Sequence, residues 1–145
     1  MSSGGNDVTG RPTILQRSEA LAARRTTAQQ MAEECLSAAS ASGGEGERTF
    51  VTLEPEKIMD QARYSDAMRR HGIVPGALAG IPVSIKDLLD VAGEVTRAGS
   101  VVMDGPAATR DSPAVARLRA AGAVITGRTN MTEFAYSGVG LNPHH

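Results

Sequence analysis

The chain has 145 residues, of which 41% are hydrophobic and 21% are charged, and its formal net charge is -1. This composition is typical of a folded globular segment and excludes a disordered or collagen-like chain. The near-zero net charge and the scattering of arginines among acidic residues argue against direct binding to nucleic acid. No apolar run approaches the roughly 18 residues of a membrane-spanning helix, so no membrane association is expected.

Residues 1–12 are small and polar with several glycines, and they predict a flexible tail because they offer little apolar surface to bury. This stretch also lacks the apolar core of a secretory signal. The single cysteine, Cys35, cannot form an internal disulfide, which favours a reducing cytoplasmic location. The histidines and the cysteine show no metal-ligand spacing, so no metal is expected.

Residues 13–40 carry apolar side chains at helix-like intervals, which predicts one helix and leaves an interruption of it open. A glycine-rich break at residues 42–47 precedes a β-branched and aromatic run at residues 49–53, which predicts a short strand. Pro55 suits a first helical turn, and a second amphipathic helix is expected from there until Gly72 closes it.

Residues 76–87, GALAGIPVSIKD, predict a loop followed by a strand. The apolar residues of this strand share one face: Ile81, Val83 and Ile85. Because side chains alternate along a strand, Ser84 and Lys86 are expected on the opposite face, where close packing best explains the small serine. Lys86 and Lys57 are the only two lysines, so they are the only side-chain amines that could act as a titratable base.

Glycines punctuate the stretch after this strand and predict a long loop. Asp111 or Ser112 is expected to cap a helix that opens at Pro113 and stops at Gly122. Residues 123–126 then predict a second strand. A strand, a helix and a strand in this order indicate a parallel pair in an α/β sheet, joined by a crossover helix.

Residues 122–129, GAVITGRT, nearly fit the phosphate-binding pattern of two glycines followed by lysine and then serine or threonine. The strand-forming residues between the glycines, and Arg128 in the place of that lysine, favour a strand instead. Residues 130–137 are expected to form a turn or short helix, in which Glu133 is a helix-start acid and Phe134 a core residue.

The segment GIPVSIKD and the downstream stretch LRAAGAVITGRTNMTEFAYSG resemble the amidase signature family. The resemblance begins near Ala62 and includes several residues between these two segments: Asp87, Leu88, Asp90, Val91, Gly93, Thr96, Ala98, Gly99 and Ser100. It implies an α/β fold in which this chain supplies the N-terminal part of the amidase-signature mixed sheet with surrounding helices. Residues 13–145 are then expected to be the N-terminal segment of a single amidase domain that is incomplete in this chain.

This resemblance implies hydrolysis of the C–N bond of carboxylic amides by a Ser–cisSer–Lys triad, of which only Lys86 is in this chain. In the family, the neutral lysine accepts a proton through the cis-serine, which activates the nucleophilic serine for attack on the amide carbonyl. Such a lysine must be buried so that its pKa is lowered. Both serines lie downstream in the family, so this chain alone is expected to be inactive.

The resemblance further implies that Ala135, Tyr136 and Ser137 lie near the acyl pocket and contact a small-molecule amide substrate, with no cofactor and no metal. Two alternatives stay open. One is a catalytically inactive fragment, or a module that depends on a partner to complete its sheet. The other is the amidase subunit of an aminoacyl-tRNA amidotransferase, whose other subunits bind the RNA. Because unpaired strand edges favour association, a homo-oligomer or a partner chain is also expected.

Overall fold

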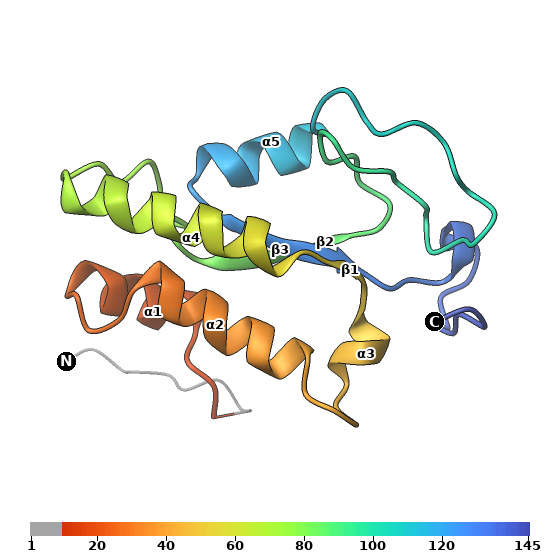
Figure 1. Cartoon of the computed structure of the whole chain (residues 1–145), viewed down its shortest axis with the longest axis horizontal. Coiled ribbons are helices and arrows are strands. Elements are labelled where there is room, and N and C mark those ends of the chain that lie inside the picture. The colour runs from red at the N-terminus through yellow and green to blue at the C-terminus, as the bar shows by residue number, and fades with distance from the viewer. Residues whose placement is uncertain (1–9) are drawn as a thin grey trace.

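The computed structural model describes residues 10–145, so most of the tail predicted at residues 1–12 lies outside the described residues. Figure 1 shows a small sheet with helices packed around it. In chain order the elements are α1 (Ile14–Ala22), α2 (Ala28–Ala39), α3 (Gly46–Thr49), β1 (Phe50–Leu53), α4 (Pro55–Arg70), β2 (Pro82–Lys86), α5 (Pro113–Ala120), β3 (Val124–Thr129) and the 3-10 turn η1 (Glu133–Ala135). The predicted α/β class is confirmed. No helix within the described range is long and apolar enough to cross a bilayer.

The sheet has the strand order β1-β3-β2, with β3 in the middle. β2 and β3 are parallel, as the strand-helix-strand pattern predicted, and β1 is antiparallel to β3. The sheet is therefore mixed. The strand predicted at residues 123–126 proves longer, because β3 continues through Gly127 and Arg128 to Thr129.

The register between β2 and β3 shifts by one residue in the middle of the strands. Val83 pairs with Ile125 and Ile85 pairs with Arg128, so β3 contains one more residue than β2 between these two pairs. Such a β-bulge re-aims the side chains that follow it. It puts Arg128 on the buried face with Ile85 and leaves Lys86 on the opposite, exposed face.

The predicted N-terminal helix forms two helices, α1 and α2. Each begins with a capping box, Thr13 with Gln16 in α1 and Thr27 with Gln30 in α2. In such a box the threonine side chain accepts a backbone N–H of the first turn, and the glutamine side chain accepts the N–H of the threonine. A second start signal within one apolar pattern explains the interruption. Arg24, between the two helices, adopts a positive φ of 55°.

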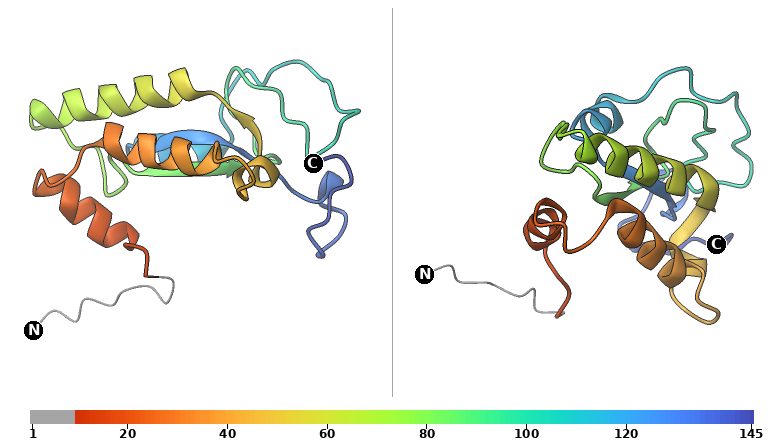
Figure 2. Two further views of the ribbon diagram at one scale, coloured as in Figure 1. Left: turned by 60° about the horizontal axis from the view of Figure 1, so that its bottom comes forward. Right: turned by 60° about the vertical axis from the view of Figure 1, so that its left-hand side comes forward.

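Two apolar clusters lie on opposite sides of β3, because Val124 and Ile125 are successive residues of a strand. The cluster around Val124 comes from α2 and α4: Ala28, Ala32, Ile58 and Ala62. The cluster around Ile125 comes from β2, the loop after it, and α5 with the residue before β3: Ile85, Val91, Val115 and Ala123. Figures 1 and 2 show α2 and α5 on opposite sides of the strands. Both faces of the middle strand are therefore covered.

A side chain of α4 satisfies the backbone of β3 beyond the end of β1. The Nε2 of Gln61 donates to the carbonyl of Ile125, and its Oε1 accepts the N–H of the same residue, both at 3.1 Å. β1 ends at Leu53, which pairs with Gly127. Because buried backbone groups need partners, a helix side chain here takes the place of a further strand residue.

Asp66 of α4 holds the first turn of α2. Its carboxylate accepts the N–H of Ala28 at 2.8 Å and the N–H of Gln29 at 3.1 Å, and the residue is only 6% exposed. The first N–H groups of a helix have no acceptor within that helix, and a negative charge is favourable there. Asp66 therefore joins two helices that are distant in the sequence.

Replacing Asp66 with alanine should lower the free energy of unfolding by about 1–3 kcal/mol, because amide groups at the buried start of α2 lose their acceptor. Asp60→Ala is the matched control on the same helix, since the Asp60 side chain is 73% exposed and pairs with exposed Arg63. Its effect should stay below about 0.5 kcal/mol. Urea unfolding followed by circular dichroism measures both variants, and equal effects would contradict this role of Asp66.

Candidate functional site

Lys86 is the last residue of β2 and lies at the carboxyl end of the parallel pair. It pairs with Thr129 of β3, and its carbonyl accepts the N–H groups of Leu88 at 2.7 Å and Leu89 at 3.0 Å. Lys86 and Ser84 are both exposed, so the predicted alternation along this strand is confirmed. Ligands of α/β sheets bind outside the carboxyl ends of the strands. The position therefore suits a functional amine.

The amine of Lys86 makes no hydrogen bond or ion pair with any residue in the range 10–145. Its side chain is exposed, so the burial expected of a lysine base is not found within this part of the chain. The place of the amine is therefore set by the backbone that carries it.

Lys57, the other lysine, has a different environment on α4. Its Nζ lies 2.7 Å from Oε2 of Glu54, and both side chains are well exposed. The hydrogen bond to Glu54 raises the pKa of Lys57 above the ordinary value of 10.5, and the charge of Glu94 contributes further. A lysine held protonated in this way is unsuited to act as a base at neutral pH.

Glu54→Gln should lower the pKa of Lys57 towards 10.5, because it removes the carboxylate that raises this pKa most. A pKa raised by folding stabilises the folded chain at pH values below the pKa of the unfolded lysine. That contribution is lost as the pH rises through the folded pKa. Carbon-13 NMR of the dimethylated lysines measures the titration.

The control for this substitution is Glu56→Gln, on the same turn of α4, which should leave the titration of Lys57 unchanged. An unchanged pKa of Lys57 in the Glu54→Gln chain would show that the pair does not form in solution.

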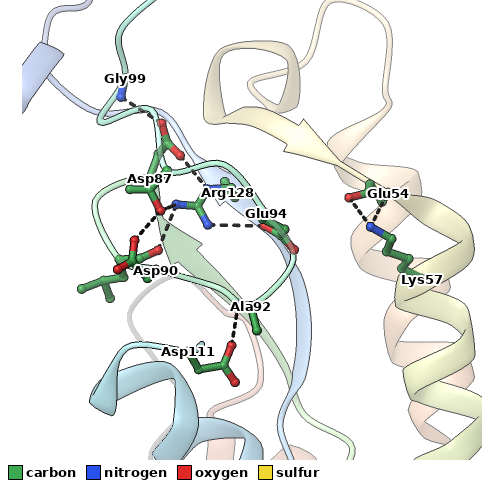
Figure 3. A network of polar contacts seen from close by, with 11 residues as sticks. Glu54, Lys57, Asp87, Asp90, Ala92, Glu94, Gly99, Asp111 and Arg128 are labelled. Carbon is green, nitrogen blue, oxygen red and sulfur yellow. Dashed lines mark hydrogen bonds and ion pairs between the residues drawn. The ribbon is translucent and has the colours of Figure 1, made fainter. Parts of the chain in front are cut away.

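Asp87 and Arg128 form a buried ion pair at the residue that follows Lys86 (Figure 3). Nε of Arg128 donates to Oδ1 of Asp87 at 2.6 Å, and the two side chains are 2% and 1% exposed. Oδ2 of Asp87 accepts the N–H of Gly99 at 2.9 Å. Because an isolated charge is costly to bury, each of these side chains depends on the other.

The remaining donors of Arg128 tie the loop after β2 to β3. Nη1 lies 3.3 Å from Oε2 of Glu94, and Nη2 donates to the carbonyl of Leu89 at 2.9 Å. Nη2 also donates to the hydroxyl of Thr96 at 3.1 Å, and that hydroxyl donates to Asp90 at 2.8 Å. One guanidinium therefore holds several positions along the loop.

The sequence did not predict this network, although Asp87 and Arg128 both lie in the segments that resemble the amidase signature family. The available signal was a charged residue inside an otherwise strand-like stretch, since a charge that is buried there requires a partner.

The predicted start of α5 also has a second role. Ser112 occupies the N-cap position but its side chain makes no capping hydrogen bond, whereas Asp111 accepts the N–H of Ala92 at 2.8 Å and pairs with Arg119 at 3.0 Å.

A cavity of about 330 Å³ lies between α4, the loop after β2 and β3. Its wall includes charged side chains of both signs: Glu54, Lys57, Asp60, Glu94 and Arg119. Neither Lys86 nor the predicted substrate residues at 135–137 belong to this wall. The cavity and the predicted catalytic residue are therefore separate features.

The segment of the chain that matches a known protein family includes both Lys86 and the Asp87–Arg128 pair. Residues 30–144 match the sequence model of the Amidase family. The chain belongs to the amidase family. The resemblance expected from the sequence motifs is thus confirmed.

Two curated relatives illustrate what this amidase chain is similar to. A glutamyl-tRNA(Gln) amidotransferase subunit of Cereibacter sphaeroides is 42% identical over 123 residues, which are 85% of this chain and 24% of the relative. The AtzE subunit of the 1-carboxybiuret hydrolase of Pseudomonas sp. strain ADP is 38% identical over 128 residues, which are 88% of this chain and 28% of the relative. The chain therefore spans about a quarter of the length of these relatives.

Solved structures agree with the amidase fold. The peptide amidase from Stenotrophomonas maltophilia matches with a TM-score of 0.80 at 28% identity, over 92% of this chain and 28% of that one. A further amidase crystal structure matches with a TM-score of 0.80 at 35% identity, over 90% of this chain and 29% of that one. The expected place of the chain in an amidase-signature α/β fold is confirmed.

The segment after β3 carries the predicted substrate residues of the amidase chain. Ala135 ends η1 with a positive φ of 57°, and Tyr136 is 93% exposed. Ser137 is also exposed, and its hydroxyl accepts the N–H of Val139 at 3.2 Å. Because β3 is parallel to β2, this segment leaves the sheet at the end where Lys86 lies. Within residues 10–145, no hydrogen bond joins Lys86 to it.

The prediction that Phe134 is a core residue is wrong. Phe134 is 51% exposed and has a positive φ of 54°. Its N–H donates to the carbonyl of Ala98 at 2.9 Å, and the neighbouring Glu133 accepts the hydroxyl of Ser100 at 2.6 Å. Polar contacts of the backbone and of Glu133 therefore dock this turn, and they leave the ring of Phe134 outside.

Proposed function

We propose that the polypeptide containing this chain hydrolyses the C–N bond of carboxylic amides, with Lys86 as the base of a Ser–cisSer–Lys triad. The observation that carries the proposal is a lysine at the carboxyl end of β2, within the segment that matches the Amidase family. Relatives described as a 1-carboxybiuret hydrolase and a peptide amidase support an amide substrate. Residues 13–145 are the N-terminal segment of one amidase domain in this proposal.

In the proposed reaction, the neutral amine of Lys86 takes a proton from the cis-serine while that serine takes the hydroxyl proton of the nucleophilic serine. The nucleophilic oxygen attacks the amide carbonyl and forms a tetrahedral intermediate. Its collapse breaks the C–N bond, the departing ammonia or amine receives the proton, and an acyl-enzyme remains. Water then hydrolyses the ester and restores both serines and the amine.

The exposure of Lys86 in this chain supports a triad that is completed from outside residues 10–145. In this proposal, the part of the enzyme that brings the two serines to Lys86 also buries its amine, as the mechanism requires. Ala135, Tyr136 and Ser137 contact the acyl part of the amide in this proposal. Their support is the path of their segment, which leaves β3 at the same end of the sheet as Lys86.

Within the described residues, the outer edges of β1 and β2 have no neighbouring strand. Unpaired edges favour pairing with another strand, so the proposed enzyme completes its sheet with further sequence, a second copy or a partner chain. The cytoplasm is the proposed location, which the single cysteine supports because it cannot form an internal disulfide.

A chimera tests the proposed function. Residues 30–144 replace the matching segment of the Stenotrophomonas maltophilia peptide amidase, and ammonia release is measured on a panel of peptide and aliphatic primary amides. The chimera is expected to be active, whereas the 145-residue chain alone is expected to be inactive. Turnover by the chain alone would contradict the need for downstream serines. A chimera that folds, as judged by circular dichroism and gel filtration, but hydrolyses no amide would contradict the function itself.

The identity of 42% to a glutamyl-tRNA(Gln) amidotransferase protein favours a second candidate, the amidase subunit of an aminoacyl-tRNA amidotransferase. Other subunits bind the RNA in this case. The same replacement made in the Cereibacter sphaeroides relative should then retain co-purification with the other subunits of that enzyme. Loss of co-purification by a folded chimera would remove this candidate and leave the simple amidase.

A further inference from the structure

We infer that Arg128, acting through Asp87, is a positioning residue for the amine of Lys86. This inference rests on the proposed function, since it concerns the base of the proposed triad. Arg128 does not act on the substrate itself, because its side chain is 2% exposed and its guanidinium nitrogens are bonded to groups of this chain. Its effect on Lys86 passes through the backbone.

Lys86 depends on its backbone for its position. Its amine has no partner among the described residues, so no contact at the tip of the side chain holds it. Pairing with Thr129 holds the residue within the sheet, and bonds from Leu88 and Leu89 to its carbonyl begin the turn that follows. A change in the geometry of that turn therefore moves the Cα and Cβ atoms of Lys86.

Asp87 anchors this turn through both its backbone and its carboxylate. Its N–H donates to the carbonyl of Thr129 at 3.2 Å, and its own carbonyl accepts the N–H of Ala98 at 2.8 Å. Its carboxylate accepts from Arg128 at 2.6 Å and from the N–H of Gly99 at 2.9 Å. The residue after Lys86 is thus joined both to β3 and to the far end of the loop.

One strand, β3, holds both anchors of the turn. Thr129 pairs with Lys86, and the preceding residue, Arg128, binds the carboxylate of Asp87 (Figure 3). The β-bulge in β3 makes this possible, because it places Arg128 opposite Ile85 on the buried face. Loss of the Arg128 side chain removes the side-chain anchor of the turn on β3, while the backbone pairing of Lys86 with Thr129 and the bond from the Asp87 N–H to Thr129 remain.

A buried ion pair alone is weak evidence of net stability, since apolar residues of similar size often stabilise a fold as well. What the pair adds is a defined geometry: the fork of Arg128 also binds Glu94 and the carbonyl of Leu89, so the loop has one arrangement that satisfies it. The test must therefore report on the environment of the Lys86 side chain and on opening of the loop after β2.

The test uses the whole chain and its two lysines, Lys57 and Lys86, as paired probes. Reductive methylation with labelled formaldehyde gives each lysine a carbon-13 NMR signal, and hydrogen exchange is followed at the amides of Ala98 and Gly99. In Arg128→Gln, we expect the Lys86 signal to shift or broaden by more than the Lys57 signal, because Lys57 senses Arg128 only through the charge of Glu94. Exchange at the two amides should rise by about tenfold or more. In Arg128→Lys, which keeps one charged donor, the change in the Lys86 signal and the rise in exchange should both be smaller.

Arg63→Gln is the matched control, because Arg63 forms an exposed ion pair with Asp60 on α4. It should leave both Lys86 and the two amides unchanged. The inference is overturned if the Lys86 signal and the exchange rates in Arg128→Gln match those of the unmodified sequence. If Arg128→Gln loses its circular dichroism signal, Arg128→Lys and Asp87→Asn decide in its place: a native Lys86 signal in both overturns the inference.

The chimeric enzyme separates this inference from the proposed function. There, Arg128→Lys should lower kcat by about tenfold with little change in KM, because it misplaces a base without removing a substrate contact. Full activity of Lys86→Ala in the same chimera would refute the proposed function, whereas the NMR result on the chain alone would still decide whether Arg128 positions Lys86. An unchanged kcat for Arg128→Lys together with an inactive Lys86→Ala would refute the positioning role alone.

Discussion

Lys86→Ala in the peptide amidase chimera should lower kcat for amide hydrolysis by roughly 10⁴-fold or more, the scale of effect seen when a member of a catalytic triad is removed. Without the amine, the cis-serine has no base to receive its proton, and the nucleophilic serine stays protonated. KM should change little, because Lys86 acts on the serines and not on the bound amide. Ammonia release under saturating amide measures the loss.

Lys57→Ala is the matched control for this prediction, since it removes the other lysine of the chain. Lys57 is exposed on α4 and pairs with Glu54. Its removal should change kcat by less than about twofold, within the range of an ordinary surface substitution. Equal losses in the two variants would show that Lys86 has no special role, and wild-type activity of Lys86→Ala would exclude it as the base.

Arg128→Ala should lower the free energy of unfolding of the chain by about 3–5 kcal/mol, because it leaves the carboxylate of Asp87 buried without its counter-ion. Asp87 is 1% exposed, so water can solvate its carboxylate only when the loop after β2 opens. A loss of this size is a large part of the roughly 5–15 kcal/mol by which a domain is stable. Urea unfolding at neutral pH measures it.

A double-mutant cycle with Asp87→Ala identifies the cause of this loss. The double variant should be less destabilised than the sum of the two single variants, because it buries no unpaired charge. Arg63→Ala, which removes one partner of the exposed Asp60 pair, should cost less than about 1 kcal/mol. Strict additivity of the two buried substitutions would contradict direct coupling between Asp87 and Arg128.

Local patterns predicted the parallel pair of strands correctly. The alternation of apolar and polar residues in β2 showed which face would carry Lys86, and the helix between two strands implied their parallel arrangement. The family resemblance added the role expected of Lys86. What these patterns could not show was the bulge in β3, because the register of two strands is set by their contact and not by either sequence alone.

The buried ion pair escaped prediction for a related reason. Arg128 and Asp87 are separated by 41 positions, and Arg128 and Glu94 by 34, so only the fold brings them together. Phe134 was misjudged because an aromatic residue is usually buried. Here the contacts that dock its turn are polar, and they come from Ala98 and Ser100 in a distant loop.

The middle position of β3 has a consequence for how the chain folds as it is synthesised. β1 and β2 are both hydrogen-bonded to β3 and not to each other, although β3 follows them in the chain. The side chain of Gln61 likewise forms its hydrogen bonds with Ile125, which lies 64 positions later in the chain. Contacts between such distant positions form slowly, because a long segment must be ordered before they are gained. On the ribosome, the sheet therefore cannot begin to assemble until β3 has left the exit tunnel, and until then both earlier strands are accessible to chaperones.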